Sequence, residues 1–189
     1  EVVKQLVNLY KRGQFSTLIK EAEDLLQLYP ASPVIWDILA TANAQIGMLD
    51  EAIEAYKKTI SLKPDYVDAY NNMGIILRNQ GKFDEAISVY KKVIVLKPDY
   101  VKAYINMGIA FKDQDKFDEA IEAYKKAILI KPDHVEAYDN MGIALKNQGK
   151  FDMAIETFKK TLLIKPNNAQ VYYNMGNTFQ DQGKLDEAI

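Results

Sequence analysis

Cysteine is absent from the 189-residue chain, so disulfide bonds and thiolate metal sites are excluded. His134 is the only histidine, so the chain lacks the second histidine or the cysteine that a metal cluster or a cysteine–histidine catalytic pair would need. It stands at the turn position that Tyr66 and Tyr100 hold in other repeats, so we expect a packing role. A glycine-rich phosphate-binding loop is also missing. We therefore expect no catalytic residue, no metal site, no cofactor and no enzymatic activity in this chain.

The charge balance and the hydrophobic runs exclude two further classes of protein. A formal net charge of −2 lacks the basic excess of a dedicated nucleic-acid binder. No apolar run approaches the roughly 18 residues of a membrane span. We expect neither nucleic acid nor a membrane as a partner, and a cytoplasmic location. The chain starts at Glu1 instead of methionine and stops at Ile189 within a repeat, so we expect a trimmed piece of a longer protein.

The chain does contain a short phrase, first seen at Tyr70–Gly74 (YNNMG), that returns at a constant spacing. Its close copies are Tyr104–Gly108, Tyr138–Gly142 and Tyr172–Gly176. An asparagine keeps its place in every copy, while the residue before it varies freely. A second phrase follows at a fixed distance, as in Gln80–Ile87 (QGKFDEAI). A fixed period of this length is typical of a solenoid built from short repeats.

Evenly spaced prolines divide the chain into repeats of the same period, which together form one array. The predicted units are 1–32, 33–66, 67–100, 101–134, 135–168 and a partial unit 169–189, with the prolines at Pro30, Pro64, Pro98, Pro132 and Pro166. Apolar spacing predicts two helices per unit, an A helix at about 68–79 and a B helix up to about 97 in the third unit. Gly81 ends the A helix, Asp84 is placed to cap the B helix, and Pro98 stops it.

Recurring small and large residues predict close packing between the two helices of a unit. A small residue holds one column (Ala40, Gly74, Gly108, Gly142, Gly176), and rings hold another (Tyr56, Tyr90, Tyr124, Phe158). Small residues let two helix backbones approach while the rings fill the space beside them. We interpret Tyr70, Met73, Gly74 and Leu77 as the core face of their helix. A third column is alanine, the last at Ala188.

Two departures from the pattern carry expectations of their own. In the first unit Leu18 stands in the alanine column and Ala22 in the ring column, so large and small residues have changed places. Volume is conserved, and this unit is expected to act as an N-terminal cap. Asp115 replaces the turn glycine of the other repeats, and aspartate tolerates the left-handed backbone well enough to keep that turn.

These phrases resemble the tetratricopeptide repeat (TPR) over the whole chain, most weakly in the first unit. Trp36, Leu39 and Ala40 are similar to the opening phrase of that family. The resemblance implies an all-α fold, a right-handed solenoid of antiparallel helix pairs whose A helices line a concave, peptide-binding groove. Residues Tyr172–Thr178 are similar to repeats of the O-linked N-acetylglucosamine transferases, which carry an asparagine ladder, and the array is similar to bacterial TPR proteins.

The A-helix face opposite the predicted core carries the candidate peptide-binding residues. They comprise an asparagine column, an isoleucine column, further amides and a row of cations: Asn72, Asn106, Asn140, Asn174, Ile75, Ile109, Ile143, Asn79, Asn177, Arg78, Lys112 and Lys146. An asparagine amide offers a donor and an acceptor, which suits pairing with the backbone of an extended peptide. The alternative is that the asparagines hydrogen-bond neighbouring helices and the isoleucines pack between repeats.

Charged columns support fewer functional interpretations. A clamp for a terminal carboxylate needs cations, but the matching positions hold residues such as Asn71, Ile75 and Glu136. The row of Arg78, Lys112 and Lys146 would favour an acidic ligand, although a solvated helix edge is the commoner meaning. The lysine pairs of the B helices are interpreted as solvated surface supported by nearby glutamates.

Three hypotheses about function follow. The first is a protein-interaction scaffold that binds an extended peptide in the A-helix groove. The second is the substrate-recognition arm of a larger glycosyltransferase or sulfotransferase, motivated by the end of the chain at Leu185–Ile189. The third is a self-associating module that stacks end to end through Tyr172, Met175 and Phe179 of the truncated last repeat.

Overall fold

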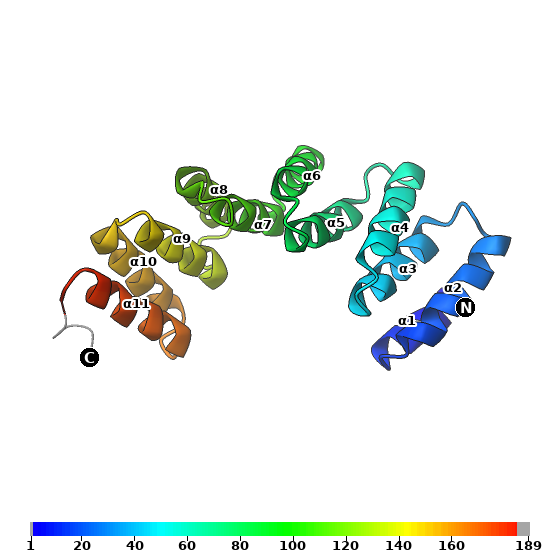
Figure 1. The fold of residues 1–189 in the computed structure, drawn as a ribbon, viewed down its shortest axis with the longest axis horizontal. Helices are drawn as coiled ribbons and strands as arrows, with labels where there is room; N and C mark the ends of the chain where they lie inside the picture. Colours follow the sequence, from blue (N-terminus) through cyan, green and yellow to red (C-terminus); the bar gives the residue numbers. More distant parts are fainter. Residues whose placement is uncertain (1, 185–189) are drawn as a thin grey trace. The chain divides into compact units, whose positions relative to one another are not determined.

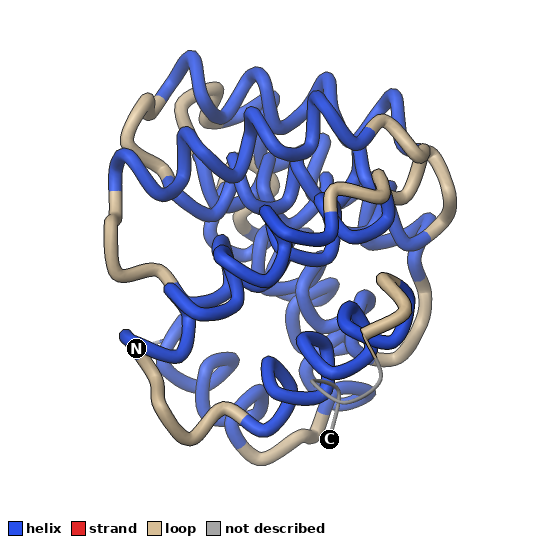
Figure 2. Tube along the Cα trace, turned by 90° about the vertical axis from the view of Figure 1, so that its left-hand side faces the viewer, coloured by secondary structure: helices blue, strands red, loops and turns tan. Residues whose placement is uncertain are grey.

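A computed structural model describes residues 2–184, which contain eleven α-helices and no strand (Figures 1 and 2). The A helices are α1 (Val2–Lys11), α3 (Pro33–Gln45), α5 (Val67–Asn79), α7 (Val101–Lys112), α9 (Val135–Asn147) and α11 (Ala169–Asp181). The B helices are α2 (Phe15–Leu28), α4 (Leu49–Leu62), α6 (Phe83–Leu96), α8 (Phe117–Ile130) and α10 (Phe151–Ile164). The predicted all-α helix-pair solenoid is confirmed.

The helices group into two compact units, Glu1–Lys97 and Pro98–Ile189. In each unit an A helix packs on its own B helix, and α2, α4, α8 and α10 each pack on the A helix that follows them. Successive A helices are also in contact, as α3 is with α5 and α7 with α9, whereas α4 and α6, or α8 and α10, are not. The A helices therefore form the inner side of each unit, and the B helices form its outer side.

Turns between the two helices of a repeat use a left-handed residue, as the sequence predicts. Gly81 has φ +75°, and the amide of Lys82 donates to the carbonyl of Leu77 at 2.9 Å. Asp115 adopts φ +58° in the equivalent place, and the amide of Lys116 reaches the carbonyl of Phe111 at 2.9 Å. The turn therefore survives the replacement of glycine by aspartate, because aspartate tolerates the left-handed region better than most residues.

The predicted cap at Asp84 is wrong. Helix α6 begins at Phe83, and the residue before it, Lys82, makes no side-chain capping bond. Asp84 therefore lies inside the first turn, where its charge still suits the positive end of the helix dipole. The bond partners of the equivalent aspartates in other repeats lie in the next repeat along the chain, as described below.

Glycines of the A helices touch the rings of the B helices, as the size pattern predicts. A Cβ built on Gly74 would lie 2.5 Å from a ring carbon of Tyr90. Gly142 meets Phe158 in the same way. Two further apolar positions, Ala69 and Ile76 in α5, are buried at 0% and 5% exposure, and the predicted core face omitted them. The equivalents of Ala69 are Ala103 and Ala137, and those of Ile76 are Ala110 and Ala144, all of them buried. Both columns are visible in the sequence.

Candidate functional site

The four asparagines of the predicted ladder are all half-buried on their A helices. In α9 the Nδ2 of Asn140 donates to the carbonyl of Glu136, one turn earlier, at 3.0 Å. Its Oδ1 and its second N–H make no hydrogen bond within residues 2–184. In α11 the Oδ1 of Asn174 accepts from Nε2 of Gln170 at 3.2 Å. Both side chains thus keep unused donor capacity at the inner surface of the second unit.

Asn72 has a structural partner in the first unit. The Tyr56 hydroxyl of α4 lies 3.0 Å from Oγ1 of Thr41 and also interacts with Asn72. Burial raises the pKa of Tyr56, and the interactions with Thr41 and Asn72 oppose that rise. The alternative in which an asparagine links neighbouring helices therefore has support at Asn72. In the second unit Phe158 holds the ring column without a hydroxyl, yet Asn174 remains.

The isoleucine column is shared between the core and the surface. Ile109 and Ile143 are half-buried and pack against the core of the second unit, and Ile75 is half-buried in α5. The remaining amides differ in exposure, because Asn79 is exposed whereas Asn177 is half-buried. The column thus offers a partly exposed apolar strip beside the asparagines while also holding the repeats together.

The row of cations is largely engaged by neighbouring side chains. Nζ of Lys146 in α9 lies 3.1 Å from a carboxylate oxygen of Asp181 in α11, which joins two successive A helices. Nζ of Lys112 lies 2.9 Å from the carboxylate of the adjacent Asp113. The Arg78 guanidinium donates to Oδ1 of Asn79 at 3.3 Å. These pairs weaken the case for a row of free cations that would attract an acidic ligand.

In two repeats the residue directly before the asparagine column binds the residue that precedes the next A helix. The hydroxyl of Tyr66 donates to the carboxylate of Asp37 at 3.1 Å, and Asn168 donates to Asp139 at 3.4 Å. Burial and the nearby charge of Asp37 raise the pKa of Tyr66 to about 12. Burial likewise raises the pKa of Asp37, although its bond with Tyr66 opposes that rise.

His134 shows what happens when this pairing is lost. The place that Asp37 holds opposite Tyr66 is taken by Ile105 opposite His134, and Ile105 is 2% exposed with no hydrogen-bonding side chain. Nδ1 of His134 is buried without a partner in the structure. The histidine thus occupies the column of Tyr66, as the sequence indicates, without the hydrogen bond that the tyrosine makes. In the sequence this pairing is visible only as two polar positions that lie 29 residues apart in two repeats, a spacing shorter than the repeat.

Aspartates at the start of the B helices bind the following repeat. Nε2 of Gln148 donates to Asp118 at 2.7 Å, and Nζ of Lys150 lies 3.7 Å from the same carboxylate. The bond from Gln148 and the charge of Lys150 lower the pKa of Asp118. Equivalent bonds run from Gln80 to Asp50 at 3.0 Å and from Gln182 to Asp152 at 2.8 Å. This recurring contact explains why the Gln-Gly-Lys-Phe-Asp phrase repeats.

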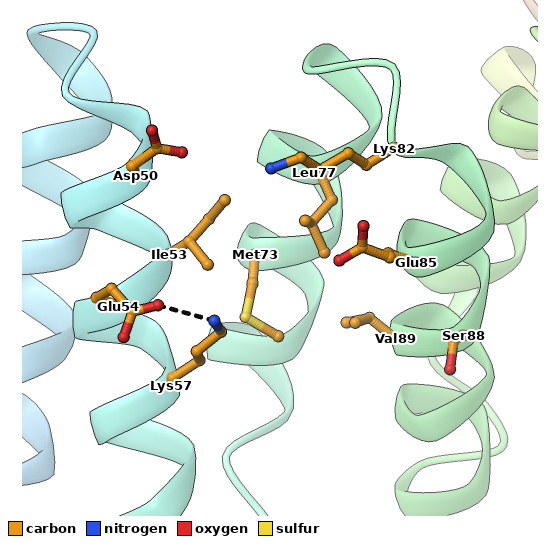
Figure 3. Close-up of a pocket in the computed structure, with 10 residues that line it drawn as sticks. All are labelled: Asp50, Ile53, Glu54, Lys57, Met73, Leu77, Lys82, Glu85, Ser88 and Val89. Atoms are coloured by element: carbon orange, nitrogen blue, oxygen red, sulfur yellow. Dashed lines mark hydrogen bonds and ion pairs between the residues drawn. The ribbon is translucent and has the colours of Figure 1, made fainter.

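Clefts open on the outer side, between successive B helices, with a methionine at the base. In the first unit such a cleft of about 460 Å³ lies between α4 and α6, and Met73 and Leu77 of α5 line it (Figure 3). A cleft of about 320 Å³ repeats this arrangement in the second unit around Met141 and Leu145. Met73 is 8% exposed and Met141 is half-buried, so the methionine column borders both the core and these clefts.

Neither a metal centre nor a membrane-spanning helix is found in the part of the chain that the structure describes. Residues 2–184 hold no group of three or more histidine, aspartate or glutamate side chains suited to a metal ion. No helix in the same range combines the length and the apolar content that crossing a bilayer needs. Tyr172 and Tyr173 of α11 are 53% and 65% exposed, while Leu185–Ile189 and the alanine at 188 lie outside the described residues.

The fold and the site define a helix-pair solenoid with polar and apolar columns on its inner side. Family models assign its class directly. The model described as "TPR repeat" matches residues 42–78, 74–115 and 145–183, which together exceed half of the chain. Models described as "Tetratricopeptide repeat" match residues 101–134 and 123–156. The chain belongs to the tetratricopeptide repeat family.

Solved structures share this architecture. A crystal structure of MamA matches with a TM-score of 0.79 and 29% identity, covering 86% of this chain and 95% of that one. A tetratricopeptide repeat protein from Parabacteroides merdae matches with a TM-score of 0.86 and 18% identity, covering 100% of this chain and 75% of that one. The second likeness is one of fold alone.

Curated relatives match over shorter segments. The peroxisomal targeting signal receptor of Candida albicans is 31% identical over 75 residues, which is 40% of this chain and 13% of the receptor. Hsp70-Hsp90 organizing protein 2 of Arabidopsis thaliana is 32% identical over 57 residues, which is 30% of this chain and 10% of that protein. The match spans only about an eighth or less of these relatives.

Proposed function

We propose that this chain is a non-catalytic scaffold that binds an extended peptide segment of a partner protein on the inner, A-helix side. The observation that carries the proposal is the unused hydrogen-bonding capacity of Asn140 on a partly exposed surface. Asn174 adds to it, because that asparagine is kept where Phe158 offers no hydroxyl for it to bind. The packing role seen for Asn72 does not account for this retention.

The chemistry of the column suits a backbone ligand. Each amide side chain presents a donor and an acceptor, and an extended peptide presents the same two groups on its backbone. Recognition of this kind is tolerant of the ligand's side chains, while the half-exposed Ile109 and Ile143 offer apolar contact between the polar groups. The short match to a peroxisomal targeting signal receptor, a protein whose name indicates that it receives a signal, supports a peptide ligand here.

A terminal carboxylate is not the ligand that these residues favour. Lys112 and Lys146 each lie within 3.1 Å of a carboxylate of the chain itself, so neither is a free cation for a ligand. The short match to Hsp70-Hsp90 organizing protein 2, a protein whose name indicates that it organizes other proteins, supports a role in protein interaction. A free scaffold and the recognition arm of a larger enzyme would both use the same inner surface, so both parent arrangements remain predictions.

The proposal predicts that Asn106→Ala with Asn140→Ala weakens peptide binding. A peptide is first selected on the protein from a randomised library, and its Kd is then measured by calorimetry. Losing two to four hydrogen bonds should raise the Kd by about 10- to 100-fold. The melting temperature should change by only about 2 °C, since both side chains are half-buried on the surface.

Asn167→Ala serves as the matched control, because Asn167 is an exposed residue of the loop before α11 and does not belong to an A helix. Its Kd should equal that of the unchanged protein. Equal binding by the double variant, or a large fall in its melting temperature, would instead assign the asparagines to repeat packing.

A further inference from the structure

The outer faces of two B helices in the second unit carry the same exposed stripe. Along α8 the exposed positions recur at i, i+3, i+4, i+7 and i+8, which is one helix face. They are Glu122, Lys125, Lys126, Leu129 and Ile130 in α8, and Glu156, Lys159, Lys160, Leu163 and Ile164 in α10. Lys131 and Lys165 follow directly. We call the lysines and aliphatic residues of this surface the lysine–leucine band.

The aliphatic side chains of the band are exposed to a degree that packing does not explain. Leu129 is 75% exposed and Leu163 is 84% exposed. In the first unit Val95 of α6 occupies the equivalent position and is 74% exposed. Neither of the two clefts described above is lined by any of these three side chains. An aliphatic side chain that projects into water in three repeats gains nothing from the fold of its own chain.

Lysines flank these aliphatic residues along the chain, and the next acidic residue after Leu129 is the exposed Asp133. From residue 123 to 132 the charged side chains are all lysine, and the same holds from 157 to 180. Glu122 and Glu156 reach only the nearer lysines, at 2.8 Å from Lys125 and 4.0 Å from Lys159. Lys126 and Lys160 form no ion pair within the described residues, so the band is positive beside its exposed leucines.

We infer that the lysine–leucine band docks the protein on an anionic lipid surface. Aliphatic side chains enter the boundary between headgroups and acyl chains, while flanking lysines contact anionic headgroups. The sequence-based expectation of no membrane partner rested on the lack of a spanning segment, which does not bear on surface binding. The band lies on the B helices, so it leaves the inner asparagine surface free for a peptide.

The observations favour lipid over two other occupants. A protein partner gains most of its affinity from anchors held in complementary pockets, whereas Leu129 and Leu163 project from the surface. A second copy pairing symmetrically through this face would set lysine rows against lysine rows, which repel. A bilayer demands no matching shape and supplies the negative charge.

Co-sedimentation with lipid vesicles tests this inference on the full chain. The protein should bind vesicles that contain roughly a third phosphatidylserine and should not bind pure phosphatidylcholine vesicles. Salt should weaken that binding, since exposed charges are screened. Leu129→Ser with Leu163→Ser should weaken binding roughly tenfold or more, because two side chains lose their burial in lipid. Lys126→Gln with Lys160→Gln should weaken it as well.

Leu28→Ser is the matched control, because Leu28 is 72% exposed at the end of α2 in the first unit, where no lysine lies in the last helical turn. It should bind anionic vesicles as the unchanged protein does. The inference is overturned if the protein does not sediment with anionic vesicles, or if the leucine double variant binds them as tightly as the unchanged protein. Dimerisation that the leucine substitutions abolish, in a protein that binds no vesicle, would assign the band to a second copy.

Discussion

Gly142 and Phe158 show how single residues set the distance between the two helices of a repeat. A Cβ at Gly142 would lie 2.5 Å from a ring carbon of Phe158, which is closer than such atoms pack. Phe158 is fully buried, and protein interiors are packed closely enough that its ring can move only if its neighbours also shift. Glycine is disfavoured inside a helix, and its presence here is explained by this contact.

Gly142→Ala is therefore expected to destabilise the protein, although alanine is the better helix former. Overpacking costs about 1–3 kcal/mol, and the gain in helix propensity returns up to about 1 kcal/mol. The free energy of unfolding should fall by up to about 2 kcal/mol in urea denaturation.

Phe158→Leu provides the control for this prediction. A shorter side chain leaves room for the added methyl group, so Gly142→Ala should cost less in that background or become neutral. An equal cost in both backgrounds would show that the contact with Phe158 is not the reason for the glycine.

Sequence reasoning at this scale succeeds where both residues of a contact keep the same kind of side chain from repeat to repeat. The pairing of small and ring residues is visible because both members recur together. The role of Asp37 escapes it, because the partner Tyr66 lies 29 residues further along the chain, directly before α5, and both identities change between repeats. The asparagine column is visible as a column, but its individual bonds, such as that of Asn140 with Glu136, depend on the conformation of each side chain.

Helices of neighbouring repeats are joined by a second kind of contact, between the first turn of a B helix and the end of the next A helix. Asp118 of α8 accepts from Gln148, the residue that directly follows α9. Because Asp118 is exposed, the contact contributes to the orientation of the helices more than to burial. Its recurrence in both units indicates a common geometry between successive repeats.

Gln148→Ala is expected to raise the pKa of Asp118 toward its ordinary value. The bond from Gln148 is the main cause of the lowered pKa, with the Lys150 charge second among the causes that lower it. A lowered pKa in the folded state gives stability that is complete above the unfolded pKa. That stability is lost as the pH falls through the lower, folded pKa. Titration of the Asp118 carboxylate by NMR measures this shift.

Gln182→Ala is the matched control for this titration, because Gln182 makes the equivalent bond to Asp152, one repeat further along the chain than Asp118. It should leave the Asp118 titration unchanged. If Asp118 titrates identically with and without Gln148, the bond between the two helices is not formed in solution.

The boundaries of the elements could be read from the sequence because proline, glycine and apolar spacing act over short distances along the chain. The A helix predicted at about 68–79 is observed as α5, Val67–Asn79. The cap predicted at Asp84 failed because local capping is only one use of an aspartate near a helix start. In the equivalent repeats the carboxylate is bound by a glutamine of the following repeat.

At the scale of the whole molecule, each unit presents two chemically different sides. The A helices carry half-buried asparagines and isoleucines, for which we propose a peptide ligand. The B helices of the second unit carry exposed leucines among lysines, for which we propose a lipid surface. The repeat pattern predicts which residues form columns on each side. The burial of each residue in the structure is needed to tell the columns that stabilise the fold from those that are exposed and free to bind a partner.

The central claim, that the asparagine column binds a peptide backbone, is tested most directly by NMR of the side-chain amides. The protein is labelled with ¹⁵N and titrated with a peptide selected from a randomised library. The account predicts that the side-chain amide signals of Asn140 and Asn174 shift with the peptide, while that of the loop residue Asn167 stays in place. Binding that leaves the signals of Asn140 and Asn174 unmoved would contradict it.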